Sequence, residues 1–225
     1  MSAPSAMGVR SEGHLHHPSP EAAAEFGQLA SDERIDAAAA ALQANGIRCQ
    51  VVDSGEEARA AVQTILPIGA EVFNNTSRTL EAIGVAEDIE RSRQYQPLRP
   101  RLYQMDREMQ GREMRQLGAA PDYVVGSVHA ATEDGSLLIA SASGSQLGPL
   151  ASGAGHVILV IGGQKIVSDL ATGLRRINEY CFPLEDRRAR ETYGVPSGVN
   201  NILVINRVVA PGRVTAILVR ESIGF

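Results

Sequence analysis

The 225-residue chain carries 21 Lys and Arg against 26 Asp and Glu, a formal net charge of -5, without any run of basic residues. This balance disfavours nucleic acid as a partner, because a phosphate backbone is bound by clustered positive charge. Hydrophobic residues make up 44% of the chain, but aromatic residues are only 4% and Trp is absent. The core must therefore be aliphatic, which suits a parallel sheet covered by helices.

Cysteine usage and hydropathy indicate a cytoplasmic protein. Two cysteines, Cys49 and Cys181, are too few for a disulfide framework or a structural zinc site, which fits a reducing compartment. No apolar run of roughly 18 residues is present, so we expect no membrane partner, and the first residues lack the apolar stretch of a secretory signal.

The start of the chain differs in composition from the rest. Residues 1–20 mix Ser, Pro, Gly and His, so we expect a disordered tail followed by a single domain over residues 21–225. A metal held by His14, His16 and His17 would be adventitious, and we expect no functional metal.

The first half of the domain predicts two helices followed by a β-α-β unit. Ala-rich residues 21–44 predict the two helices, the second capped by Ser31 and ended by Asn45-Gly46. A strand over residues 47–52, a helix over 54–66 and a strand over 70–73 follow.

The second half predicts more strands than helices. Compact apolar segments predict strands over residues 123–125, 137–139, 157–161, 202–205 and 214–219. A helix is expected over residues 166–180, and Ala210-Pro211-Gly212 is expected to join the last two strands as a hairpin. The predicted fold class is α/β, a mostly parallel sheet flanked by helices with an antiparallel C-terminal edge.

Small polar residues follow three of the predicted strands. Thr76, Ser77 and Thr79 open a short helix directly after a strand, where hydroxyls and free amides can cradle a carboxylate or phosphate. The alternative is a helix cap that satisfies only itself. Two Gly- and Ser-containing loops follow later strands and contribute Ser143, Gly144, Ser145, Gln164 and Lys165. Because the carboxyl ends of parallel strands share one edge, we expect these groups to converge on one anion-binding pocket.

Several sequence blocks, in a fixed order, resemble the LUD family of lactate-utilisation proteins. They include Gly126-Ser127-Val128-His129-Ala130-Ala131-Thr132-Glu133-Asp134-Gly135, Gly163-Gln164-Lys165-Ile166-Val167 and Thr76-Ser77-Arg78-Thr79-Leu80-Glu81-Ala82-Ile83-Gly84. The resemblance covers roughly residues 30–225. It implies a fold similar to the ribose-phosphate isomerase and CoA transferase group, and a role in bacterial oxidation of L-lactate to pyruvate alongside iron–sulfur partner proteins.

The resemblance also suggests candidate catalytic residues, each with a structural alternative. CoA transferases of this fold place a nucleophilic Glu in a turn, so Glu133 is a candidate, although Glu-Asp-Gly is also an ordinary turn. His129 could move a proton in the same pocket or be a hydrogen-bonded structural group. Arg187, within the charged segment of residues 185–188, could clamp a carboxylate or face solvent.

The sequence allows three functions: an accessory protein, a stand-alone enzyme and a ligand sensor. The leading hypothesis is an accessory component of L-lactate, or similar 2-hydroxy acid, oxidation that binds a small carboxylate or a partner protein. Because no clustered cysteines are present, we expect no cofactor in this chain and iron–sulfur clusters only in its partners. The alternative is a stand-alone isomerase- or CoA-transferase-like enzyme using Glu133 and Lys165. A regulatory ligand sensor is the third, and a homo-oligomer stays open.

Overall fold

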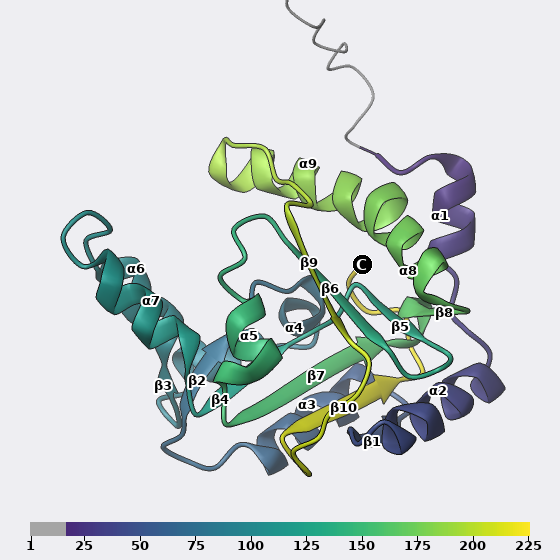
Figure 1. Cartoon of the computed structure of the whole chain (residues 1–225), viewed down its shortest axis with the longest axis horizontal. Helices are drawn as coiled ribbons and strands as arrows, with labels where there is room; N and C mark the ends of the chain where they lie inside the picture. Colours follow the sequence, from purple (N-terminus) through teal and green to yellow (C-terminus); the bar gives the residue numbers. More distant parts are fainter. Residues whose placement is uncertain (1–16) are drawn as a thin grey trace, which may run out of the picture.

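A computed structural model describes residues 17–225 (Figure 1). Most of the expected tail, including His14 and His16, lies outside the described residues. The Ser19 hydroxyl accepts a hydrogen bond from the amide of Ala22 and caps α1 (Pro20–Phe26). Ser31 caps α2 (Asp32–Ala44) in the same way, through the amide of Arg34, which confirms the two predicted helices.

Six parallel strands form the main sheet, in the order β1-β10-β7-β4-β2-β3. They are β1 (Arg48–Val52), β2 (Glu71–Asn74), β3 (Gln96–Pro97), β4 (Tyr123–Gly126), β7 (His156–Gly162) and β10 (Val214–Val219). Strands β7 and β10 are buried almost throughout, as a strand with helices on both faces requires. The predicted α/β class is confirmed.

Alternate side chains of the central strands serve two separate cores. On one face, Leu159 and Leu218 pack with Leu42 of α2. On the other, Val160 and Ile217 pack with residues from three helices. These helices are α3 (Gly55–Ile65), α4 (Arg78–Ala82) and α5 (Val85–Arg91). The period of two along each strand therefore places helices on both faces of the sheet.

A second, mixed sheet has the order β8-β5-β6-β9. Its strands are β5 (Ala130–Thr132), β6 (Leu137–Ser141), β8 (Ile166–Val167) and β9 (Asn201–Ile205). This second sheet is accompanied by α8 (Leu170–Arg176), the π-helical turn η3 (Ile177–Cys181) and α9 (Phe182–Tyr193). Two other helices, α6 (Leu98–Gln104) and α7 (Gly111–Ala119), extend from the β2–β3 end of the main sheet (Figure 1). Two short turns complete the chain, η1 (Pro149–Gly153) and η2 (Gly163–Lys165).

The predicted hairpin of the last two strands is wrong. Strand β9 is an antiparallel edge strand of the second sheet, paired with β6, whereas β10 lies parallel between β1 and β7 in the main sheet. The apolar character of β10 on both faces, typical of a central strand, outweighs the turn-forming Pro211-Gly212.

The predicted helix over residues 166–180 also needs correction. Its first two residues, Ile166 and Val167, form β8 and pair with β5. The helical path then continues past Pro183. The π-helical turn η3 precedes this proline, and the Phe182 amide donates a hydrogen bond to the Ile177 carbonyl across that wider turn.

Candidate functional site

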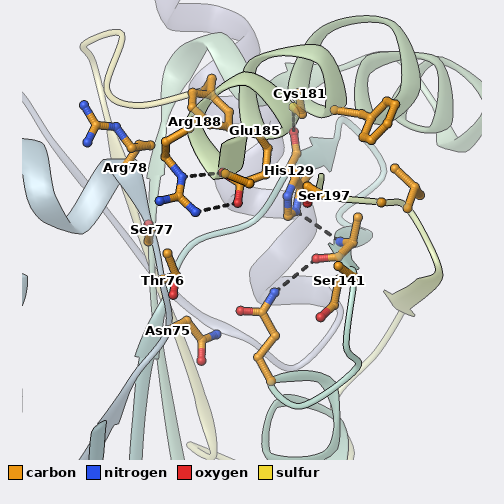
Figure 2. Close-up of a pocket in the computed structure, with 18 of the residues that line it drawn as sticks. Asn75, Thr76, Ser77, Arg78, His129, Ser141, Cys181, Glu185, Arg188 and Ser197 are labelled. Carbon is orange, nitrogen blue, oxygen red and sulfur yellow. Dashed lines mark hydrogen bonds and ion pairs between the residues drawn. The ribbon is translucent and has the colours of Figure 1, made fainter. Parts of the chain in front are cut away.

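The candidate site lies where three neighbouring strands of the main sheet end. Asn75 follows β2, Ser127 follows β4, and η2 with Lys165 follows β7. These segments open onto a cavity of about 330 Å³, here called the first cavity. In Figure 2, Asn75, Thr76 and Ser77 line one side and His129, Ser141 and Ser197 the other, with Glu185 and Arg188 above.

The first cavity brings together seven of the predicted site residues and leaves out four. Those that line it are Thr76, Ser77, Thr79, His129, Ser143, Ser145 and Lys165. Gly144 lines an adjoining cavity. Outside the lining of both cavities are Glu133, Gln164 and Arg187.

Lys165, the only lysine of the sequence, forms the floor of the cavity. Lys165 is 1% exposed, and its Nζ donates hydrogen bonds to the hydroxyls of Thr79 at 2.8 Å and Ser127 at 3.0 Å. Burial, and then the positive charge of Arg176, lower the pKa of Lys165 from 10.5 to about 7. The amine is therefore close to half-charged at neutral pH.

A second buried cation lies behind this floor. Arg176 is fully buried and donates to the His129 carbonyl, to Cys181 Sγ at 3.0 Å and to the Phe26 carbonyl at 3.4 Å. Among residues 17–225, no ion pair joins Arg176 or Lys165 to an Asp or Glu. Buried charges are normally paired, so this floor favours an anion.

His129 acts on the cavity as a neutral imidazole. Burial, together with the charges of Lys165 and Arg176, lowers the pKa of His129 from 6.5 to about 3. Nδ1 accepts a hydrogen bond from the Ala140 amide at 3.1 Å, so the ring proton lies on Nε2. At neutral pH the ring is therefore uncharged, and its Nε2–H is a hydrogen-bond donor.

The hydroxyl groups after β2 have different hydrogen-bond partners. Ser77 caps α4 by accepting from the Leu80 amide at 3.3 Å, whereas Thr79 accepts from Lys165 and donates to the Ile223 carbonyl. Thr76 is exposed at the mouth. The cap and the polar cavity wall are therefore both present in the same segment.

Asn75 is the least satisfied polar group of the wall. Asn75 is 4% exposed, and within residues 17–225 neither atom of its side-chain amide has a hydrogen-bond partner. A Cβ added at Gly126 would lie 2.8 Å from Asn75 Nδ2, so glycine at that position lets this side chain reach the cavity. A buried amide without partners favours a ligand that supplies them.

The residues of α9 that cover the first cavity, Glu185 and Arg188, are not predicted from the sequence; they are here called the roof. Arg188 Nε and Nη2 both donate to the Glu185 carboxylate at 2.7 Å, and the Arg188 guanidinium lies 5.2 Å from the centre of the Tyr193 ring. The sequence predicts Arg187 within this charged segment, whereas Arg188 lines the cavity. Helical spacing was the missing signal, since residues 185, 188 and the buried Ala189 share one face of α9.

The predicted residues outside the cavity have other contacts. Glu133 lies in the turn after β5 and pairs with Arg34 at 2.6 Å, with 39% of its side chain exposed. Arg187 contacts His17 at 2.9 Å. Gln164 donates to the carbonyls of Ile223 and Gly224 and so holds the segment after β10.

Within residues 17–225, no three His, Cys, Asp or Glu side chains gather as metal ligands. No helix in the same range is both long and apolar enough to cross a bilayer.

Comparisons with known proteins agree with this fold. A family model described as LUD domain matches residues 35–219. The crystal structure of a DUF162 family protein from Deinococcus radiodurans is similar, with a TM-score of 0.53 and 14% sequence identity over 85% of this chain and 99% of that one. At this identity the likeness concerns the fold alone. No curated protein matches the sequence.

Proposed function

Because the chain belongs to the LUD domain family, and is thereby related to lactate utilisation, we propose that it binds a small 2-hydroxy or 2-oxo acid in the first cavity as an accessory component of lactate oxidation. The observation that carries this proposal is the presence of two buried cationic side chains, Lys165 and Arg176, neither of which has a carboxylate partner in residues 17–225. A ligand carboxylate would supply the missing negative charge.

The other walls suit such an acid. A volume of about 330 Å³ is at the small end for ligand pockets, which favours a compact molecule. The Nε2–H of His129 offers one donor for a carbonyl or hydroxyl oxygen, and the Asn75 amide offers both a donor and an acceptor. The carboxylate would be bound at the floor, and the substituent on the neighbouring carbon would meet these neutral groups.

Calorimetric titration with pyruvate and with L-lactate tests the proposal. We expect saturable 1:1 binding that is weakened at least about tenfold by Lys165→Met, because the substitution keeps the chain volume and removes the charge. Binding that survives this substitution unchanged, or no saturable binding up to about 10 mM of either acid, would contradict it.

The accessory role requires partners that carry the redox centres. Purification of the tagged chain from its own cells should bring iron–sulfur proteins with it, and a Lys165→Met chain should still do so, because that residue is buried. Absence of any iron–sulfur protein would remove the accessory role while leaving the carboxylate site untouched.

A stand-alone enzyme is the second candidate, and the pKa of Lys165 of about 7 favours it. An amine that is half-deprotonated at neutral pH can accept a proton from the carbon next to a carbonyl group. Exchange of the methyl hydrogens of pyruvate with deuterated water, lost in Lys165→Met, would support this role.

A further inference from the structure

A second cavity of about 720 Å³ adjoins the first. The two share Asn75, Thr76, Ser143, Ser145 and Gln146 in their linings. From this shared wall the second cavity extends to α6 and α7, the helices that project from the end of the main sheet (Figure 1). A ligand there would lie beside the first cavity rather than in it.

The lining of the second cavity is positively charged. It contains Arg99, Arg107 and Arg115, and among its described residues there is no Asp or Glu. Arg99 is partly neutralised, since Nη1 lies 3.6 Å from Glu90 and Nη2 donates to the Tyr103 hydroxyl at 2.8 Å. For Arg107 and Arg115, no ion pair with a described residue is formed. Two guanidinium groups are thus available to an anion.

Buried polar groups without partners form the inner end of this cavity. Among the described residues, Asn75 has no hydrogen-bond partner for either atom of its side-chain amide, and the Oδ1 of the fully buried Asn74 also has none. The Nδ2 of Asn74 is held by Glu90 at 2.8 Å. Such groups cost stability unless something completes their hydrogen bonds, so they are a sign of a ligand that is independent of the arginines.

Part of the remaining lining is apolar. Phe73, Leu102 and Met114 contribute carbon surface to the same cavity as the asparagines and the arginines. Residues 111, 114, 115 and 118 of α7 all line the cavity, which is the spacing of one helix face, and Arg112 is on another. A ligand would therefore meet polar amides, carbon surface and positive charge in one cavity.

From this combination of groups we infer that the second cavity binds an organic phosphate, with its phosphate groups at Arg107 and Arg115 and its uncharged part against Phe73, Leu102 and Met114. Guanidinium groups suit phosphate oxygens because each presents two parallel N–H donors. The charges of this site are separate from those of the first cavity, although the two cavities share the Asn75 side chain.

The test is calorimetric titration of the full chain with inorganic pyrophosphate at low salt. We expect 1:1 binding that is weakened at least about tenfold in Arg107→Gln/Arg115→Gln. The control is Arg112→Gln, which removes the same charge from another face of α7 and should change the Kd less than about twofold. All three arginines are exposed, so circular dichroism should show an unchanged fold.

Three results would overturn the inference. They are no saturable binding up to about 10 mM pyrophosphate, an equal loss in Arg112→Gln, or a tenfold loss in Lys165→Met with none in the double variant. The last result would place the anion in the first cavity. Pyruvate binding measured in the double variant separates the two proposals, since it should persist there whether or not pyrophosphate binds.

Discussion

Binding of a carboxylate in the first cavity should be coupled to protonation of Lys165. In the free protein the pKa of this amine is about 7, against 10.5 for an unperturbed lysine. Only the charged amine pairs with a carboxylate, and its population falls about tenfold for each pH unit above 7. The Kd for pyruvate should therefore be nearly constant below pH 7 and rise by up to about tenfold per unit above it.

The size of the coupling has an upper limit set by the pKa shift. If the bound carboxylate fully restored the ordinary pKa of Lys165, the coupling would be about 5 kcal/mol, from about 1.4 kcal/mol for each pKa unit. Residual burial and the neighbouring Arg176 reduce it. An affinity change of about 10-fold to 100-fold between pH 7 and pH 9 is therefore the expected range.

Calorimetry between pH 6 and pH 9, in buffers of different ionisation enthalpy, measures both the Kd and the protons taken up. At pH 8 binding should take up close to one proton, because the free amine is then mostly neutral. Lys165→Met should abolish proton uptake, whereas Arg91→Met, which removes an exposed cation from α5, should leave it unchanged.

The pKa itself can be read directly, because the sequence holds one lysine. Protein grown with lysine labelled by carbon-13 at Cε gives a single side-chain signal whose shift follows the charge. A midpoint near 7 that moves upward with pyruvate is expected. A midpoint near 10 in the free protein, with a Kd that does not change from pH 7 to pH 9, would refute the reasoning.

Three further predictions concern stability. The pKa of His129 is about 3 in the folded protein against 6.5 in the unfolded chain, so its contribution to the free energy of unfolding is present above pH 6.5 and is lost as the pH falls toward 3. Urea titration of His129→Gln should show a free energy of unfolding that depends less on pH in that range. Glu133→Gln should cost less than about 1 kcal/mol and leave lactate-supported growth nearly unchanged, because its pair with Arg34 is exposed; a stable protein with lost growth would instead make Glu133 catalytic. Gly135→Ala should lower the melting temperature more than Gly69→Ala, since φ is positive at both but only the first added Cβ meets a neighbouring backbone, 2.6 Å from the Ala41 carbonyl carbon.

The sequence predicts the parts of this protein that depend on local order. Caps such as Ser31 and the alternation of apolar residues place most helices and strands. The convergence of Thr79 with Lys165 follows from the rule that parallel strands end at one edge. The partner of each strand is not local, and β10 was therefore assigned to a hairpin although it pairs with β1 and β7.

Helical spacing alone could have placed Arg188 on the same face of α9 as Ala189, but the contact of that face with the first cavity is not local either. Arg188 faces the first cavity only because α9 crosses over the second sheet, and this placement depends on the packing of η3 against residues far away in the chain. Likewise, the arginines of the second cavity come from three places in the chain: Arg99 is on α6, Arg107 is in the turn before α7, and Arg115 is on α7. Their shared orientation arises from tertiary contacts.

The position of β10 also has a consequence for how the chain is made. On the ribosome β1 emerges early, but the one strand it pairs with is the last of the described strands to appear. Until then one edge of β7 has no neighbour, and β1 is not part of the sheet. The nascent domain therefore exposes β7 as an open, apolar edge of its sheet, a state in which strand edges are prone to aggregation and binding by chaperones. Premature termination before residue 214 would split the sheet, whereas loss of β3 would only shorten it by one edge strand.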